Sequence, residues 1–115
     1  MLKIILEFRK GILFIRLHGK LIKDTVSEFQ NEVIKLIQKN GIHTVVVNLE
    51  ELEDLDLKGM NVLLYCYESC KKNKGTALLC GIVKDNIKQR LDKGRVFNYM
   101  FQIKNELDAL QKVQV

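Results

Sequence analysis

Apolar and polar side chains alternate along the beginning of the chain. One alternating run covers residues 4–8, and after Arg9-Lys10-Gly11 a second covers residues 13–17. A period of two is typical of a strand with one buried side. Glycine adopts turn conformations that residues with a Cβ resist, so Gly11 marks a tight connection. We therefore predict an antiparallel hairpin at the edge of a sheet.

The period then changes to that of a helix. Thr25-Val26-Ser27-Glu28 has the form of a capping box, in which the first and fourth residues bond the backbone at a helix start. An apolar stripe follows it, made of Val26, Phe29, Val33, Leu36 and Ile37. Asn40-Gly41 is a usual C-terminal stop. The first predicted helix therefore runs from Thr25 to Asn40.

Three short apolar segments predict further strands. Residues 44–49 are nearly all β-branched or apolar, which is typical of a strand covered on both faces, so we expect a central, parallel strand. Residues 77–83 predict a second strand and residues 101–103 a last short one. The acidic segment 50–56 is predicted to be a loop.

Three more helices fit the spacing of the remaining apolar residues. They follow Asp56, Lys84 and Asn105, and the first two end at Asn73-Lys74-Gly75 and at Gly94. The terminal helix is expected to dock on the sheet through Leu107 and Leu110. Strands separated by helices need crossover connections and are therefore parallel. We predict one α/β domain over residues 1–115, with a mixed, mostly parallel sheet, an N-terminal antiparallel edge hairpin and about four helices.

Composition narrows the class of protein. The chain has 115 residues, of which 47% are hydrophobic and 29% charged, enough to fill one core. The longest apolar run, Val62 to Tyr67, is far shorter than the roughly twenty residues that cross a bilayer, so we expect no contact with a membrane. The first twenty residues do not resemble a secretory signal, and three cysteines suit a reducing compartment. We expect a cytoplasmic protein with free, mostly buried thiols.

A net charge of +5 raises the question of anionic partners. The basic residues form clusters at 71–74 and 84–95. Acidic residues interrupt them, and neither stacking aromatic residues nor a known nucleic-acid-binding layout accompanies them. A solvated basic face is the favoured interpretation, and binding of a phosphate backbone is the alternative.

Two clusters suggest chemistry and are given plainer interpretations. Among the acids of residues 50–56, Asp56 is placed to cap the following helix, and the others are solvated or face a basic partner. Their spacing is not that of a calcium loop. Cys66, Cys70 and Cys80 could converge, but a thiolate metal site needs a fourth ligand, so core packing is preferred. We expect no metal, no cofactor and no enzymatic activity.

The element order and two segments, Val45-Val46-Val47-Asn48-Leu49 and Leu55-Asp56-Leu57-Lys58-Gly59-Met60-Asn61-Val62-Leu63-Leu64, resemble the STAS family of bacterial anti-sigma factor antagonists. Members of that family have an apolar strand ending in Asn/Asp-Leu, a short loop, then Asp-Ser-Ser/Ala-Gly-Leu-Gly and a hydrophobic helix. The resemblance covers nearly the whole chain, including Leu17-His18-Gly19-Lys20-Leu21 at the end of the hairpin.

The resemblance implies a partner-switching protein. In the family, the unphosphorylated antagonist binds an anti-sigma factor kinase, and phosphorylation of a serine at the start of this helix abolishes binding. Here Lys58 occupies the serine position, Asn61 replaces the last glycine of the motif, and Ile22 stands where an acidic residue is common. The chain therefore departs from the family at the switch itself, since Lys58 has no hydroxyl group.

We therefore expect an anti-sigma factor antagonist-like module that binds an anti-sigma factor or serine kinase-like protein and is not switched by phosphorylation at Lys58. The expected partner-binding residues are Asp56, Leu57, Lys58, Gly59, Met60 and Asn61. Two alternatives stay open: binding of nucleic acid or an anionic surface through the clusters at 71–74 and 84–95, and a diverged STAS scaffold in a larger signalling complex. A homodimer is compatible with either interpretation.

Overall fold

The chain opens with two antiparallel strands, β1 (Leu2–Arg9) and β2 (Ile12–Leu21), in the computed structural model, which describes residues 1–113. Lys10 and Gly11 connect them with positive φ angles of 53° and 83°. Positive φ at both central residues is the conformation that matches the twist of a two-residue hairpin. The predicted hairpin is therefore confirmed, and β1 lies at the edge of the sheet.

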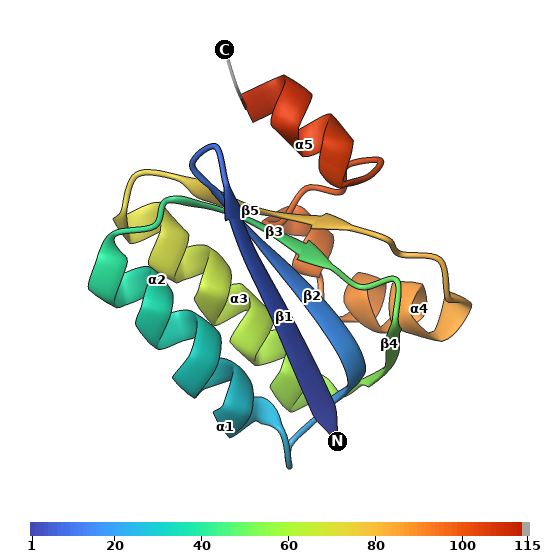
Figure 1. Cartoon of the computed structure of the whole chain (residues 1–115). Coiled ribbons are helices and arrows are strands. Elements are labelled where there is room, and N and C mark those ends of the chain that lie inside the picture. The colour runs from blue at the N-terminus through green and yellow to red at the C-terminus, as the bar shows by residue number, and fades with distance from the viewer. Residues whose placement is uncertain (114–115) are drawn as a thin grey trace.

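The sheet is built around β2, which pairs on both of its sides. Its strand order is β1-β2-β3-β5, where β3 is Thr44–Asn48 and β5 is Thr76–Cys80, and β4 (Leu52–Leu55) also pairs with β2. The pairings among β2, β3, β4 and β5 are all parallel. Figure 1 shows β3 between its two neighbours. The predicted central, parallel strand and the mixed sheet are thus confirmed.

Three details of the strands differ from the prediction. The acidic segment is not wholly a loop, because residues 52–55 form β4, where buried Leu52 and Leu55 enclose the exposed Glu53 and the half-buried Asp54. Strand β5 ends at Cys80, before the predicted Val83. Residues 101–103 form a single parallel bridge to Leu79 rather than a strand.

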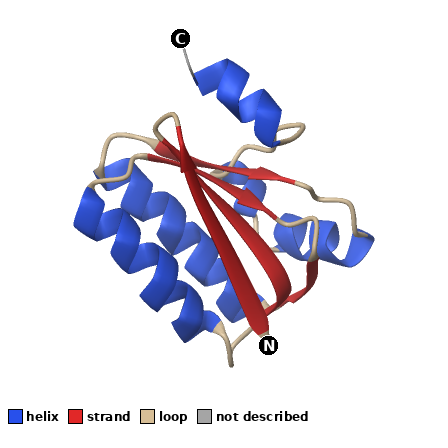
Figure 2. Cartoon of the chain, viewed as in Figure 1, coloured by secondary structure: helices blue, strands red, loops and turns tan. Residues whose placement is uncertain are grey.

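Most helices cover one face of the sheet (Figure 2). The first is a continuous run composed of α1 (Val26–Phe29), the π-helical turn η1 (Gln30–Ile34) and α2 (Lys35–Asn40). The others are α3 (Leu57–Lys72), α4 (Asp85–Lys93) and the 3-10 turn η2 (Val96–Asn98). Among residues 1–113, no helix combines the length and apolar composition needed to cross a membrane.

The predicted capping box at Thr25 is wrong, although the helix begins there. Thr25 is the N-cap, but its side chain makes no capping hydrogen bond to the helix. Its Oγ1 instead donates to the carbonyl of Lys20 at 2.8 Å and accepts from the amide of Ile22 at 3.0 Å. The hydroxyl group therefore stabilises the turn between β2 and α1 rather than the start of the helix.

The core has two parts on opposite sides of the sheet. The larger part lies against α1, α3 and α4, and the smaller part lies beneath α5 (Glu106–Val113). Ala109 of α5 is fully buried there and Leu110 partly buried, but Leu107 is 61% exposed, so its predicted docking role is wrong. Residues 109 and 110 face the sheet, and residue 107 lies on another side of this short helix.

Candidate partner-binding site

Asp56 closes the start of α3 and joins it to the end of β2. Its Oδ1 accepts a hydrogen bond from the amide of Gly59 at 2.8 Å, which confirms the predicted N-cap. Its Oδ2 accepts from the amide of Lys23 at 2.9 Å. A carboxylate in this position also complements the positive end of the helix dipole. One side chain therefore fixes the first turn of α3 against the connection between β2 and α1.

Two of the six candidate residues serve the interior of the protein. Gly59 is buried, and a Cβ at this position would overlap the carbonyl oxygen of Leu21 and lie 2.8 Å from Cδ1 of Leu55. Met60 is only 7% exposed, and its sulfur lies against Gly94. The structure thus uses Gly59 for a close approach between α3 and β2, and Met60 to pack α3 near the end of α4.

The other three candidates form the outer surface of the first turns of α3. Leu57 is 64% exposed, and Lys58 and Asn61 are also exposed. Residues three and four positions apart are neighbours on a helix surface, so Leu57 and Asn61 adjoin each other. The cap at Asp56 holds this surface in place. It offers an apolar side chain, a positive charge and an amide to a partner.

The acidic segment and the second basic cluster contact each other. Lys84 donates from Nζ to the carbonyl of Glu50 at 2.9 Å, and Arg90 lies 3.8 Å from Asp54. Both members of the second pair are nearly half exposed, so that ion pair stabilises the fold little. Two cations of the cluster at 84–95, Lys84 and Arg90, are therefore turned toward the acidic segment.

The three cysteines do not converge. Cys66 and Cys70 lie in the part of the core beneath the helices, whereas Cys80 lies in the part beneath α5. The predicted free, buried thiols are confirmed. A hydrogen bond with Cys70, together with burial, raises the pKa of Cys66, and burial raises the pKa of Cys80 to about 12. Among residues 1–113, no three His, Cys, Asp or Glu side chains are grouped to hold a metal ion.

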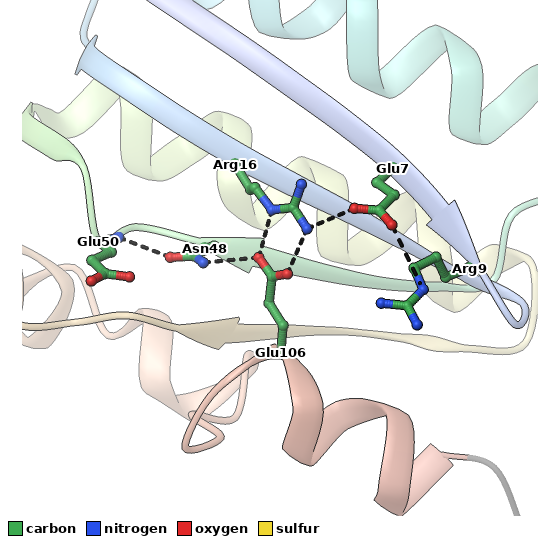
Figure 3. Close-up of polar contacts among 6 residues, drawn as sticks. All are labelled: Glu7, Arg9, Arg16, Asn48, Glu50 and Glu106. Atoms are coloured by element: carbon green, nitrogen blue, oxygen red, sulfur yellow. Dashed lines mark hydrogen bonds and ion pairs between the residues drawn. The ribbon is translucent and has the colours of Figure 1, made fainter.

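Sequence reasoning missed a polar network beside α5 (Figure 3). Arg16 of β2 donates to both carboxylate oxygens of Glu106, at 2.9 and 2.7 Å, and to Glu7 of β1 at 2.8 Å. Asn48 of β3 donates to Glu106 at 2.9 Å. These bonds lower the pKa of Glu106, chiefly through Arg16. An open groove of about 460 Å³, with both Arg16 and Glu106 in its lining, lies beside the network.

A family model for the STAS domain matches residues 3–110. The chain belongs to the STAS-domain family. Among curated proteins, this STAS domain is 28% identical over 114 residues to an anti-sigma F factor antagonist from Paenibacillus polymyxa, and the match covers 99% of this chain and 97% of that protein. The family resemblance predicted from the two segments around Asp56 is therefore confirmed.

Solved structures show the same fold. SpoIIAA, an anti-sigma factor antagonist in its unphosphorylated form, matches this STAS domain with a TM-score of 0.77 at 20% identity, covering 97% of this chain and 98% of that one. An anti-sigma factor antagonist from Mycobacterium paratuberculosis matches with a TM-score of 0.85 at 16% identity, covering 100% of this chain and 96% of that one. The predicted α/β fold class is confirmed.

Proposed function

We propose that this STAS domain is an anti-sigma factor antagonist-like module that acts in the cytoplasm by binding an anti-sigma factor kinase rather than by catalysis. The observation that carries the proposal is the exposed surface of Leu57, Lys58 and Asn61 at the start of α3. Asp56 fixes this start, because its carboxylate accepts hydrogen bonds from the amide of Gly59 at 2.8 Å and from the amide of Lys23 at 2.9 Å. Membership of the STAS family and the name of the curated relative support this class of partner.

Lys58 replaces regulation by phosphate with a fixed positive charge. A phosphate group would bring a charge of about −1.5 to −2 to a hydroxyl in this first turn. Residues 56–61 contain no hydroxyl group, so phosphorylation of a hydroxyl cannot change the charge of this surface. We infer that binding is not switched at this position and depends on the amounts of the two proteins.

The chemistry of the surface defines what the partner must offer. Leu57 suits an apolar pocket, because burying an exposed leucine stabilises a complex by about 1.5–3 kcal/mol. Lys58 suits an acidic rim, where complementary charge increases the association rate and excludes wrong partners. The partner's binding face is therefore expected to combine an apolar depression with at least one carboxylate.

The experiment is a pull-down of the tagged chain from its own cytoplasm, with and without ATP, with mass spectrometry of bait and partners. We expect an anti-sigma factor kinase, with the bait unmodified in both conditions. Titration calorimetry then compares Lys58→Glu with Lys35→Glu, an exposed lysine on α2. Lys58→Glu should weaken binding about tenfold or more, and Lys35→Glu should not.

The opposite outcomes are equally specific. A phosphorylated bait would place a switch elsewhere on the chain, and equal affinities of the two variants would remove the α3 surface from the interface. Recovery of other signalling proteins without a kinase would favour the scaffold alternative. Salt-sensitive retention of DNA or RNA would favour the nucleic-acid alternative, for which the contacts of Lys84 and Arg90 with residues 50–54 provide no support.

A further inference from the structure

The outer edge of β1 has no backbone partner among residues 1–113, because β1 pairs only with β2. The strand is eight residues long, and its middle, Ile4-Ile5-Leu6, is apolar and only partly buried. Phe8, near its end, is 60% exposed. Sheet edges that stay single are usually short, bulged or interrupted by charge or proline, because an open apolar edge pairs with another strand. This edge has an uninterrupted apolar centre.

The hairpin ladder determines which backbone groups face outward. The amide of Lys20 donates to the carbonyl of Met1 at 3.0 Å. The amide of the preceding residue, Gly19, points away from β1 and donates to the carbonyl of Glu51 at 3.3 Å. Hydrogen-bonded and non-hydrogen-bonded pairs alternate along antiparallel strands. Odd-numbered residues of β1 therefore bond to β2. The even-numbered residues, Leu2 to Phe8, direct their N–H and C=O groups to the open edge.

We propose that this STAS domain forms a two-fold symmetric homodimer in which the β1 edges of two copies pair antiparallel, centred on Ile5. The outward N–H and C=O groups of two β1 strands can bond only if even-numbered residues of one copy lie opposite even-numbered residues of the other. A register centred on Ile5 meets this condition over most of the strand. It sets Ile4 opposite Leu6 of the second copy and Ile5 opposite the same residue. The two sheets then continue into one.

Charge complementarity selects this register. Lys3 falls opposite Glu7 of the second copy, and by symmetry Glu7 falls opposite the second copy's Lys3. Opposite charges directly across a strand pair stabilise it, and like charges destabilise it. Sliding each copy by one residue toward the turn sets Lys3 opposite Arg9, which places like charges together. The Glu7 side chain is 41% exposed although its carboxylate already lies 2.8 Å from Arg16 and 3.6 Å from Arg9, so it remains accessible to the lysine of the second copy.

The face on which these charges lie is accessible. Ile5 pairs with Arg16 within the hairpin, so Lys3, Ile5 and Glu7 share the face of the sheet that carries α5, opposite α1 and α3. On the other face, Phe8 falls opposite Leu2 of the second copy, which brings an apolar neighbour to the 60% exposed phenyl ring. The occupant of this edge is therefore a second copy of the same chain.

The first test is analytical ultracentrifugation of the full chain, combined with cysteine cross-linking. A non-hydrogen-bonded antiparallel pair places its Cα atoms about 4.5 Å apart, which suits a disulfide. Ile5→Cys should therefore give a covalent dimer under mild oxidation, whereas Lys3→Cys should not, because two Lys3 positions lie about 13 Å apart along the strands. The native thiols are buried and do not compete.

The second test exchanges the charges. Lys3→Glu alone should raise the dissociation constant of the dimer about tenfold, as should Glu7→Lys alone, because each change turns two attractive cross-strand pairs into repulsive ones. Mixing the two variants should restore dimers, because each charge then faces its opposite. Lys35→Glu is the control for net charge. A monomeric wild-type chain, failure of Ile5→Cys to cross-link faster than Lys3→Cys, or mixed variants that stay monomeric while folded by circular dichroism would each overturn the proposal.

Discussion

The carboxylate of Glu106 accepts hydrogen bonds from Nε and Nη2 of Arg16, at 2.9 Å and 2.7 Å, although the two residues lie 90 positions apart. This two-point contact joins the first residue of α5 to the middle of β2 (Figure 3). An isolated helix of eight residues is not stable in water. Because Ala109 is the only fully buried residue among positions 106–112, the position of α5 depends strongly on this pair.

Replacing Glu106 should loosen α5 and leave the rest of the fold intact. We expect Glu106→Ala to lower the free energy of unfolding by about 1–2 kcal/mol, since hydrogen bonds to charged groups are stronger than neutral ones but this pair is partly screened. Urea unfolding measures the loss, and hydrogen exchange should show faster exchange in α5. Glu32→Gln, at an exposed position of η1, is the control and should change neither.

The contribution of Glu106 should depend on pH. Hydrogen bonds from Arg16 hold the pKa of Glu106 below its ordinary value of 4.5, so the native state binds this proton less tightly than the unfolded chain does. The stabilisation is therefore fully present above pH 4.5 and is lost as the pH falls below it, through the lowered pKa. The difference in unfolding free energy between wild type and Glu106→Gln should shrink from about pH 6 to about pH 3. A constant difference would contradict this assignment.

Asp56 is expected to contribute to stability through its acceptor oxygens more than through its charge. Asp56→Ala removes the acceptors for Gly59 and Lys23 and should cost about 1–2 kcal/mol, as other N-cap replacements do. Asp56→Asn keeps one acceptor and should cost less. Thermal and urea unfolding of the two variants measure the order. An equal loss in both would assign the effect to charge.

A methyl group at position 59 should disturb the packing of α3 against β2. The new Cβ of Gly59→Ala would overlap the carbonyl oxygen of Leu21, so the backbone must move, and overpacking of this kind costs about 1–3 kcal/mol. Asn61→Ala is the control on the exposed side of the same helix and should change stability by less than about 0.5 kcal/mol. Similar melting temperatures for both variants would contradict the close approach.

Several features set by neighbouring residues were predicted from the sequence, whereas some features set by distant residues were not. Gly11, Asp56 and Gly41 act within a few positions, so the hairpin, the N-cap of α3 and the end of α2 could be predicted. Strand β4 could not, because its acidic residues resemble a loop. Only its pairing with β2, after a register shift at Gly19, makes it a strand.

The candidate site was predicted in the same uneven way. Family resemblance located residues 56–61, but it could not separate the exposed Leu57, Lys58 and Asn61 from the buried Gly59 and Met60. The network around Arg16 had no local signal. An arginine in an alternating strand is ordinary, and its partner Glu106 lies 90 positions away, on a helix that follows all five strands in the chain.

The two separate cores give this protein built-in reporters of how it opens. Cys80 lies beneath α5 with Ala109, and Cys66 and Cys70 lie beneath the other helices. Local opening requires less free energy than global unfolding. A thiol reagent should therefore reach Cys80 whenever α5 detaches, and reach the α3 cysteines only when the sheet and helices separate. The order in which the three thiols become labelled therefore distinguishes detachment of α5 from unfolding of the whole domain.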